Sequence, residues 1–137
     1  MNYIEWDDRY SVNILFINEH HKTLFYIIND IYDQIKDKPI PDKNLLTKDI
    51  NRLLEYAYFH FLSEEKQMLQ FNYEGYAEHK AEHDAFTAKV KDWKDRIAND
   101  KLLLYLEMTN FLKRWLIDHI LESDKKYSKL FIANGLK

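Results

Sequence analysis

Helix-breaking residues are scarce in this chain of 137 residues, and this scarcity constrains the fold more than any other feature of the sequence. The chain has two prolines and two glycines, which are Pro39, Pro41, Gly75 and Gly135. A β-sheet protein of this length must turn many times and uses glycine and proline to do so. The sequence therefore predicts an all-α protein built from a few long helices.

Apolar residues recur at spacings of three and four along four segments, which is typical of helices that bury one face. Asn18 and Asp42 are suited to cap the first two helices. Because short links join the segments, we expect an antiparallel up-down-up-down four-helix bundle, with an N-terminal arm and a short C-terminal helix. The arm is expected over residues 1–17, the four helices at about 19–37, 43–70, 76–98 and 101–124, and the C-terminal helix within 125–137.

The same periodicity predicts which apolar side chains are buried. On the first and third helices these are Leu24, Phe25, Ile28, Ile31, Tyr32 and Ile35, and Phe86, Val90, Trp93 and Ile97. On the second and fourth they are Leu45, Leu46, Ile50, Leu53, Leu54, Ala57, Phe61, Met68 and Leu69, and Leu104, Phe111, Leu112, Trp115, Leu116, Ile120 and Leu121. His21 shares the buried stripe of the first helix, where a polar side chain needs a partner.

Composition narrows the class of protein. The length fits one domain, and 46% hydrophobic residues are enough to form a core, so we expect a single domain over residues 1–137. The net charge of −3 is spread without a basic block, which argues against a nucleic-acid partner. No stretch resembles a membrane span or a signal peptide, so we expect no membrane partner and a cytoplasmic location. Because cysteine is absent, any metal must be held by histidine and carboxylate.

Histidines and carboxylates repeat at spacings that place them on one helix face. His60 and Glu64 are four residues apart on the second predicted helix, about 40° around its axis. His79 and His83 have the same spacing on the third helix, and His21 lies on the buried face of the first. These five side chains are therefore expected to point into the bundle.

The fourth predicted helix carries a less regular pair. His119 and Asp124 are five residues apart, about 140° around an α-helix, so they converge only if Asp124 lies at the helix end or reaches across. Every helix then sends at least one ligand inward, which is how metal sites in bundle cores are built. Two neighbours are expected outside the ligand set: His20, which is about 100° round from His21 and is expected to be exposed, and Glu65.

Taken singly, each of these motifs is commonly a solvated helix face or a hydrogen-bonded core residue. Together they would bury five imidazoles and two carboxylates, and each unpaired buried charge costs several kcal/mol unless a metal is present. Imidazole with carboxylate suits iron, manganese or zinc, and seven ligands exceed the four of a structural zinc, so two ions are expected. If both ions are six-coordinate and share two bridging carboxylates and a bridging oxygen, one of the twelve positions stays open.

The order of these ligands resembles that of the hemerythrin family, and EWDDRYSV, HHKTLF, HFLSEEKQM and WLIDHILESD resemble sequences of its bacterial single-domain branch. The resemblance covers nearly the whole chain and includes all seven expected ligands. It implies two non-haem iron ions, bridged by an oxo or hydroxo group and two carboxylates, that bind O2 reversibly. It also implies that one iron is held by His79, His83 and His119, that the other, which keeps the open position, is held by His21 and His60, and that the bridges are Glu64 and Asp124.

Reversible O2 binding requires a dry pocket beside the open position. We expect this pocket to be lined by side chains that neighbour the ligands in the sequence, although the same side chains also suit plain core packing. They are Leu24, Phe61, Trp115, Leu116 and Ile120.

The chain departs from the usual pattern of the bacterial branch at three positions. Asn13 stands where glycine is frequent, Asn18 replaces a common aspartate, and His20 replaces a common glutamine. None of these changes removes a ligand. The new imidazole next to His21 is nevertheless expected to alter the support of the site, and with it the O2 affinity and the rate of autoxidation.

Three functions are compatible with such a site. The first is O2 binding for storage, for delivery to an oxygen-using enzyme or for sensing, with the partner unidentified. The second is a di-iron enzyme, namely an oxidase, a peroxidase or a nitric oxide reductase. The third is a non-catalytic metal sensor or iron-binding module, a class that one zinc per chain would favour. The sequence favours O2 binding over an enzyme, because it offers no acid–base residue near the open position that is not already a ligand.

Overall fold

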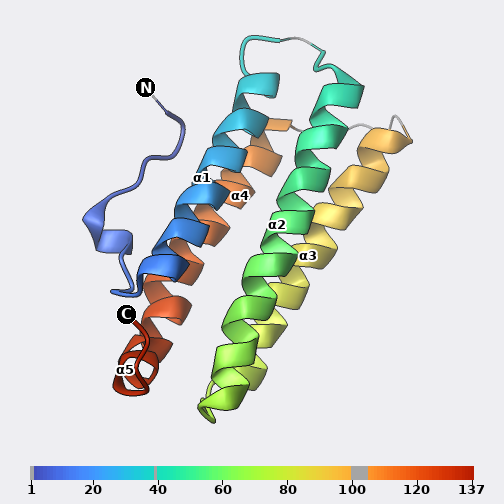
Figure 1. The fold of residues 1–137 in the computed structure, drawn as a ribbon. Coiled ribbons are helices and arrows are strands. Elements are labelled where there is room, and N and C mark those ends of the chain that lie inside the picture. The colour runs from blue at the N-terminus through green and yellow to red at the C-terminus, as the bar shows by residue number, and fades with distance from the viewer. Residues whose placement is uncertain (1, 39, 100–104) are drawn as a thin grey trace.

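Four long helices form a bundle in the computed structural model, which describes residues 2–38, 40–99 and 105–137 (Figure 1). Consecutive helices run in opposite directions, so the predicted all-α, up-down-up-down fold is confirmed. No described helix has the length and apolar character needed to span a membrane. The elements in chain order are η1 (Asp8–Tyr10), α1 (Leu15–Ile35), α2 (Lys43–Gln70), α3 (Tyr76–Ala98), α4 (Tyr105–Asp118), the π-helical turn η2 (His119–Asp124) and α5 (Lys125–Ala133).

The limits of α2 and α3 agree with the sequence analysis, and the start of α1 does not. The carboxylate of Asp42 caps α2 by accepting hydrogen bonds from the backbone N–H groups of Asn44 and Leu45, at 3.0 and 3.1 Å. Helix α3 has the predicted limits. Helix α1 begins earlier, at Leu15, so the prediction that Asn18 is its N-cap was wrong. The side chain of Asn18 instead ties the helix to the N-terminal arm, where it accepts a hydrogen bond from the Val12 N–H at 3.0 Å.

Most of the predicted buried stripes lie in the main core, which all four long helices line. Three leucines placed on these stripes are exposed instead: Leu45 by 47%, Leu69 by 59% and Leu121 by 37%. Leu45 and Leu69 lie near the two ends of α2, and Leu121 lies in the π-helical turn. Leu104 lies outside the described residues.

The N-terminal arm packs along α1 (Figure 1). Tyr3 stacks on Tyr32 with ring centroids 4.0 Å apart, and the Ile4 N–H donates to the side chain of Asn29 at 2.9 Å. Asn13, where the bacterial branch often has glycine, has a φ of 62°. This left-handed conformation favours glycine and is tolerated by asparagine better than by most residues, which explains the substitution.

A second, smaller apolar cluster closes the end of the bundle where α5 packs, as expected for the C-terminal helix. Asn134 and Gly135 end α5, with Gly135 at a φ of 97°, and the Leu15 N–H donates to the Lys137 carbonyl at 3.0 Å. The cluster consists of Val12, Ile14, Ile17, Met68, Tyr127 and Phe131. The polar site described next lies between this cluster and the main core.

Candidate metal centre

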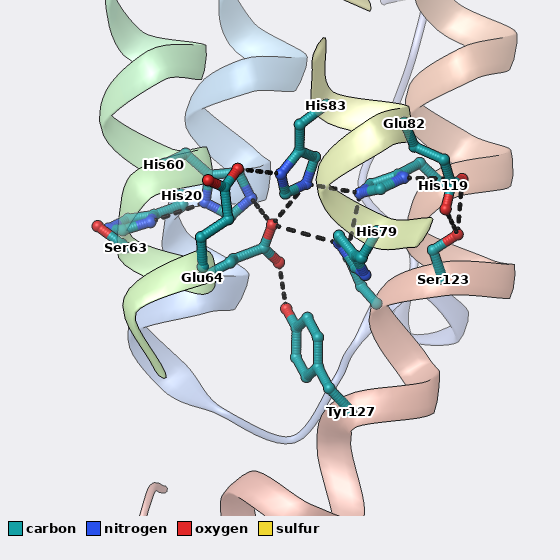
Figure 2. Close-up of polar contacts among 12 residues, drawn as sticks. His20, His60, Ser63, Glu64, His79, Glu82, His83, His119, Ser123 and Tyr127 are labelled. Carbon is teal, nitrogen blue, oxygen red and sulfur yellow. Dashed lines mark hydrogen bonds and ion pairs between the residues drawn. The ribbon is translucent and has the colours of Figure 1, made fainter. Parts of the chain in front are cut away.

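All seven side chains predicted as metal ligands meet in the interior of the bundle. Figure 2 shows His60, Glu64, His79, His83 and His119 converging there. The seven side chains come from α1, α2, α3 and η2, so every long helix or its direct extension contributes. All are buried, with exposed fractions of 3% or less. They are His21, His60, Glu64, His79, His83, His119 and Asp124.

The ligand atoms form two overlapping groups, within each of which all atoms lie within 4.8 Å of one another. The three-histidine half contains His79, His83 and His119, and the two-histidine half contains His21 and His60. Glu64 and Asp124 belong to both groups. Two neighbouring cation positions that share two carboxylates fit this arrangement.

Glu64 lies between the two halves. Its Oε1 atom is 3.3 Å from His60 Nε2 on one side, and 3.2 and 3.8 Å from the Nε2 atoms of His83 and His79 on the other. Helix α2 places His60 and Glu64 together because residues four apart lie on the same face. The carboxylate can therefore reach both cation positions.

Asp124 bridges the halves in the same way, through its two oxygens. Oδ2 lies 2.9 Å from His21 Nε2, and Oδ1 lies 3.0 and 3.1 Å from the Nε2 atoms of His79 and His119. The sequence analysis left open how two residues five apart could converge. The answer is the π-helical turn: its i→i+5 hydrogen bonding brings residues five apart onto one face, and such turns are frequent at functional sites.

The donor set fits a cation. Several buried atoms of the cluster make no hydrogen bond to any described residue, although buried polar groups usually have a partner. These atoms are His21 Nδ1 and Nε2, Glu64 Oε1, His79 Nε2, and Asp124 Oδ1 and Oδ2. Five of the six are the atoms that the short distances bring together at the centre, where bound cations would satisfy them.

Electrostatics keep both bridging carboxylates ionised. Burial acts to raise the pKa of Glu64, but the surrounding imidazoles outweigh it and the pKa lies well below its ordinary value. The pKa of Asp124 is also lowered, because His119 and His21 outweigh burial and the repulsion from Glu64. Burial acts to lower the pKa of His79 and His119, but the nearby carboxylates raise them to about 9 and about 10. In the metal-free chain, protons on His79 and His119 thus supply part of the positive charge that a bound cation would bring.

Carboxylates also support the outer nitrogens of two histidines in the three-histidine half. His83 Nδ1 lies 2.8 Å from Glu65 Oε2, and Glu65 is 8% exposed. His119 Nδ1 lies 3.3 Å from Glu82 Oε1, and Ser123 donates to the same carboxylate at 2.8 Å. The hydrogen bond to His119 lowers the pKa of Glu82 to about 2. The sequence analysis set Glu65 aside and missed Glu82 and Ser123, although Ser123 has the helical i+4 spacing from His119.

His20 is not simply exposed, as the sequence analysis expected. It is half-buried between α1 and α2, and its Nδ1 lies 2.9 Å from His60 Nδ1 (Figure 2). Burial, together with the neighbouring His60 and His21, lowers the pKa of His20 to about 4. The 100° offset from His21 turns His20 away from the metal cluster. It also turns His20 toward the outer nitrogen of the ligand His60.

Tyr127 supports Glu64 through a hydrogen bond, and the sequence analysis missed this tyrosine. Its hydroxyl donates a hydrogen bond to Glu64 Oε2, and its ring is fully buried and stacked on Phe131. Burial and the charges of Asp124 and Glu64 raise the pKa of Tyr127 well above its ordinary value, which keeps the hydroxyl protonated. The signal in the sequence was its position three residues after Asp124, one helical turn away.

The five predicted pocket residues fall into two sets. Phe61 stacks on His83 with centroids 3.8 Å apart, and Trp115 stacks on His119 at 4.5 Å, so both cover the three-histidine half. Trp115 is only half-buried and lines a surface groove. The other three, Leu24, Leu116 and Ile120, are buried in the main core with exposed fractions of 4% or less.

A small cleft of about 90 Å³ reaches the site from the end of the bundle. His79 and Glu82 line it, and none of the five predicted pocket residues does. Its remaining lining comes from Tyr73, Gly75, Glu78, Ser123 and Lys126.

Comparison with known sequences agrees with this geometry. Residues 13–131 match the family model described as the hemerythrin HHE cation binding domain. A bacteriohemerythrin from Clostridium acetobutylicum is 36% identical over 124 residues, which cover 89% of this chain and 96% of the relative. A bacteriohemerythrin from Methylococcus capsulatus is 30% identical, with 90% and 92% of the two chains covered.

Comparison with solved structures gives the same result. The crystal structure of a wild-type hemerythrin superposes with a TM-score of 0.86 at 28% identity, and the match covers 94% of this chain and 98% of the other. The match of fold, the matching family model and the relatives at 30% identity or more all lead to one assignment: the chain belongs to the hemerythrin family.

Proposed function

We propose that this protein binds O2 reversibly at a di-iron centre held by His21, His60, Glu64, His79, His83, His119 and Asp124. One observation carries the proposal: two groups of buried ligand atoms share both of their carboxylates, Glu64 and Asp124. A dinuclear centre needs such sharing, whereas a structural zinc site takes four ligands around a single ion. Membership of the hemerythrin family supports iron as the metal.

When bound, the iron pair supplies the electrons that reversible O2 binding requires. The residues of the chain hold the two ions close together through Glu64 and Asp124, and they leave the two halves with unequal numbers of histidines. If both ions are six-coordinate and an oxygen bridge completes the set, the two-histidine half has one position left for O2. We assign the O2 site to that half.

Exclusion of water is the second requirement, because a dry site limits proton leakage and irreversible oxidation. Leu24, Leu116 and Ile120 are buried in the main core, within three residues of His21 or His119 in the sequence, and we propose that they line the O2 pocket. Phe61 and Trp115 are better placed to shield the three-histidine half. Apolar side chains on the core side of the centre favour binding and release over hydrolytic or oxidative turnover.

A carrier role is preferred over an enzyme because the protic side chains that touch the ligands already hold them in place. Glu65 and Glu82 accept hydrogen bonds from His83 and His119, and Tyr127 donates to Glu64. A general acid or base must be free to exchange a proton with substrate, whereas these three groups are engaged by the ligands. Storage, delivery or sensing of O2 and a cytoplasmic location stay predictions of the sequence analysis.

The test is anaerobic loading with ferrous iron, followed by metal analysis and visible spectroscopy through repeated cycles of O2 addition and removal. We expect two irons per chain and an absorption band that appears with O2 and disappears without it. Irreversible bleaching in the first cycle would favour the enzyme alternative. One zinc per chain, with no affinity for a second ion, would overturn the di-iron assignment.

A further inference from the structure

His20 touches a ligand from outside the metal cluster. Its Nδ1 atom lies 2.9 Å from His60 Nδ1, which is hydrogen-bonding distance (Figure 2). Three aromatic rings surround the imidazole of His20: Phe16 at 5.6 Å, Tyr56 at 6.0 Å and Phe59 at 5.0 Å between centroids. The His20 ring is therefore fixed in orientation by its neighbours on α1 and α2.

The proton between the two imidazoles can be assigned from the chemistry of His60. Its Nε2 atom faces Glu64 Oε1 at 3.3 Å, on the side of the metal cluster. A metal ligand must present a lone pair, so His60 carries its proton on Nδ1 when Nε2 binds a cation. Because a neutral imidazole has one donor and one acceptor nitrogen, His60 Nδ1–H donates and His20 Nδ1 accepts.

The two-histidine half has little other support of this kind. His21 Nδ1 is buried and makes no hydrogen bond to any residue that the structure describes. His60 is thus the histidine of this half whose outer nitrogen is held, and an imidazole holds it. In the three-histidine half, the outer nitrogens of His83 and His119 face carboxylates.

We propose that His20 is a positioning residue, whose Nδ1 lone pair holds His60 in the tautomer that presents Nε2 to the two-histidine half. His20 thereby sets how tightly that half holds its ion. The inference rests on the proposed function only for the identity of the ion, since any divalent cation bound at His60 Nε2 requires the same tautomer.

Two substitutions separate the hydrogen bond from the packing of the ring. His20→Phe keeps an aromatic ring among Phe16, Tyr56 and Phe59 but has no acceptor. His20→Gln loses the ring but offers an amide oxygen that accepts a hydrogen bond. Phe16→Leu is a matched control, because it changes the packing around His20 and leaves both imidazoles in place.

The first readout is the affinity for ferrous iron, measured anaerobically by competition with a chelator. We expect His20→Phe to bind the second ion about 10- to 100-fold more weakly, while His20→Gln and Phe16→Leu stay close to the unmodified chain. The reverse order, with His20→Phe unaffected and His20→Gln weakened, would show a packing role and overturn the inference. Equal affinity in all four proteins would overturn it as well.

The second readout does not depend on iron or O2. In the chain loaded with zinc, a diamagnetic probe ion, ¹⁵N NMR should detect a coupling across the hydrogen bond between the Nδ1 atoms of His60 and His20. Absence of this coupling in the unmodified chain, when that chain holds two zinc ions, would contradict the assignment of His20. Failure of the unmodified chain to bind two ions of any kind would instead contradict the proposed function, so the two failures are distinguishable.

Discussion

The two halves of the metal centre differ in how their histidines are supported. In the three-histidine half, His83 and His119 are held from behind by the carboxylates of Glu65 and Glu82 and covered by the stacked rings of Phe61 and Trp115. In the two-histidine half, the Nδ1 atom of His60 faces the imidazole of His20 at hydrogen-bonding distance. His21 Nδ1 has no hydrogen-bond partner within the described parts of the chain.

This difference has a chemical meaning for a dinuclear site. A carboxylate behind an imidazole fixes its orientation and makes it a stronger ligand, so the three-histidine half is built to keep its ion and its ligands. The two-histidine half has fewer histidines and a neutral outer partner. We therefore expect a small molecule to add and leave at this half, which is where we propose that O2 binds.

Removal of a bridge should have the largest effect, because it acts on both halves at once. Asp124→Ala takes away the carboxylate that faces His21 on one side and His79 and His119 on the other. We expect loss of both ions, and with them the rise in melting temperature that metal loading gives the native state. Metal analysis and melting with and without iron measure this. Glu122→Ala, an exposed neighbour in η2, is the control, and retention of two ions by Asp124→Ala would contradict the shared bridge.

Removal of His60 should affect one half only. We expect His60→Ala to keep the ion of the three-histidine half, to lose most of the second ion and to lose O2 binding. Metal content per chain and the spectrum after O2 exposure report these two effects. If a chain that holds one ion still bound O2 reversibly, our assignment of the open position to the two-histidine half would be wrong.

Weakening the support of the three-histidine half should have a smaller effect. Glu65→Gln removes the charge 2.8 Å from His83 Nδ1 but keeps an acceptor of similar shape. Loss of such outer partners typically lowers metal affinity about 10- to 100-fold. The effect is best measured in the His60→Ala background, where only the three-histidine half is loaded. The control is Glu55→Gln, which changes an exposed glutamate on the same helix and should have no effect. An unchanged metal affinity of Glu65→Gln would contradict the claim that the two halves differ in how their histidines are supported.

The dependence of metal loading on pH tests the three-histidine half without changing any side chain. In the metal-free chain, carboxylates raise the pKa of His79 and His119 to about 9 and about 10, so at neutral pH a metal must displace their protons. Affinity of the three-histidine half should therefore rise with pH, by about tenfold per unit for each proton displaced, and level off as those pKa values are reached. Chelator competition between about pH 6.5 and 8.5 checks the slope. A flat profile would show that these histidines are already deprotonated.

Much of this architecture could be predicted from spacing along single helices. The limits of α3, the cap at Asp42 and the pairs four residues apart depend on local geometry, which the sequence states directly. The start of α1 was missed because the side chain of Asn18 bonds backward to the arm, and this contact depends on where the arm folds.

The outer support of the ligands was beyond reach for a different reason. His20 and Glu65 lie off the inward face of their own helices, and each touches a ligand on a neighbouring helix because of how α1, α2 and α3 are rotated in the bundle. The π-helical turn could not be predicted either. A local change from α-helical to π-helical hydrogen bonding leaves the spacing of apolar residues along α4 almost unchanged. Spacing along single helices thus predicted which side chains the structure brings together at the site. The contacts that support these side chains depend on how the helices pack.

The shared, unequal centre can be tested most directly by anomalous X-ray scattering at the iron absorption edge on crystals of the loaded protein. We expect two peaks per chain, both within coordination distance of Glu64 and Asp124, one beside His79, His83 and His119 and the other beside His21 and His60. A single peak, or two peaks that do not share both carboxylates, would contradict the dinuclear site.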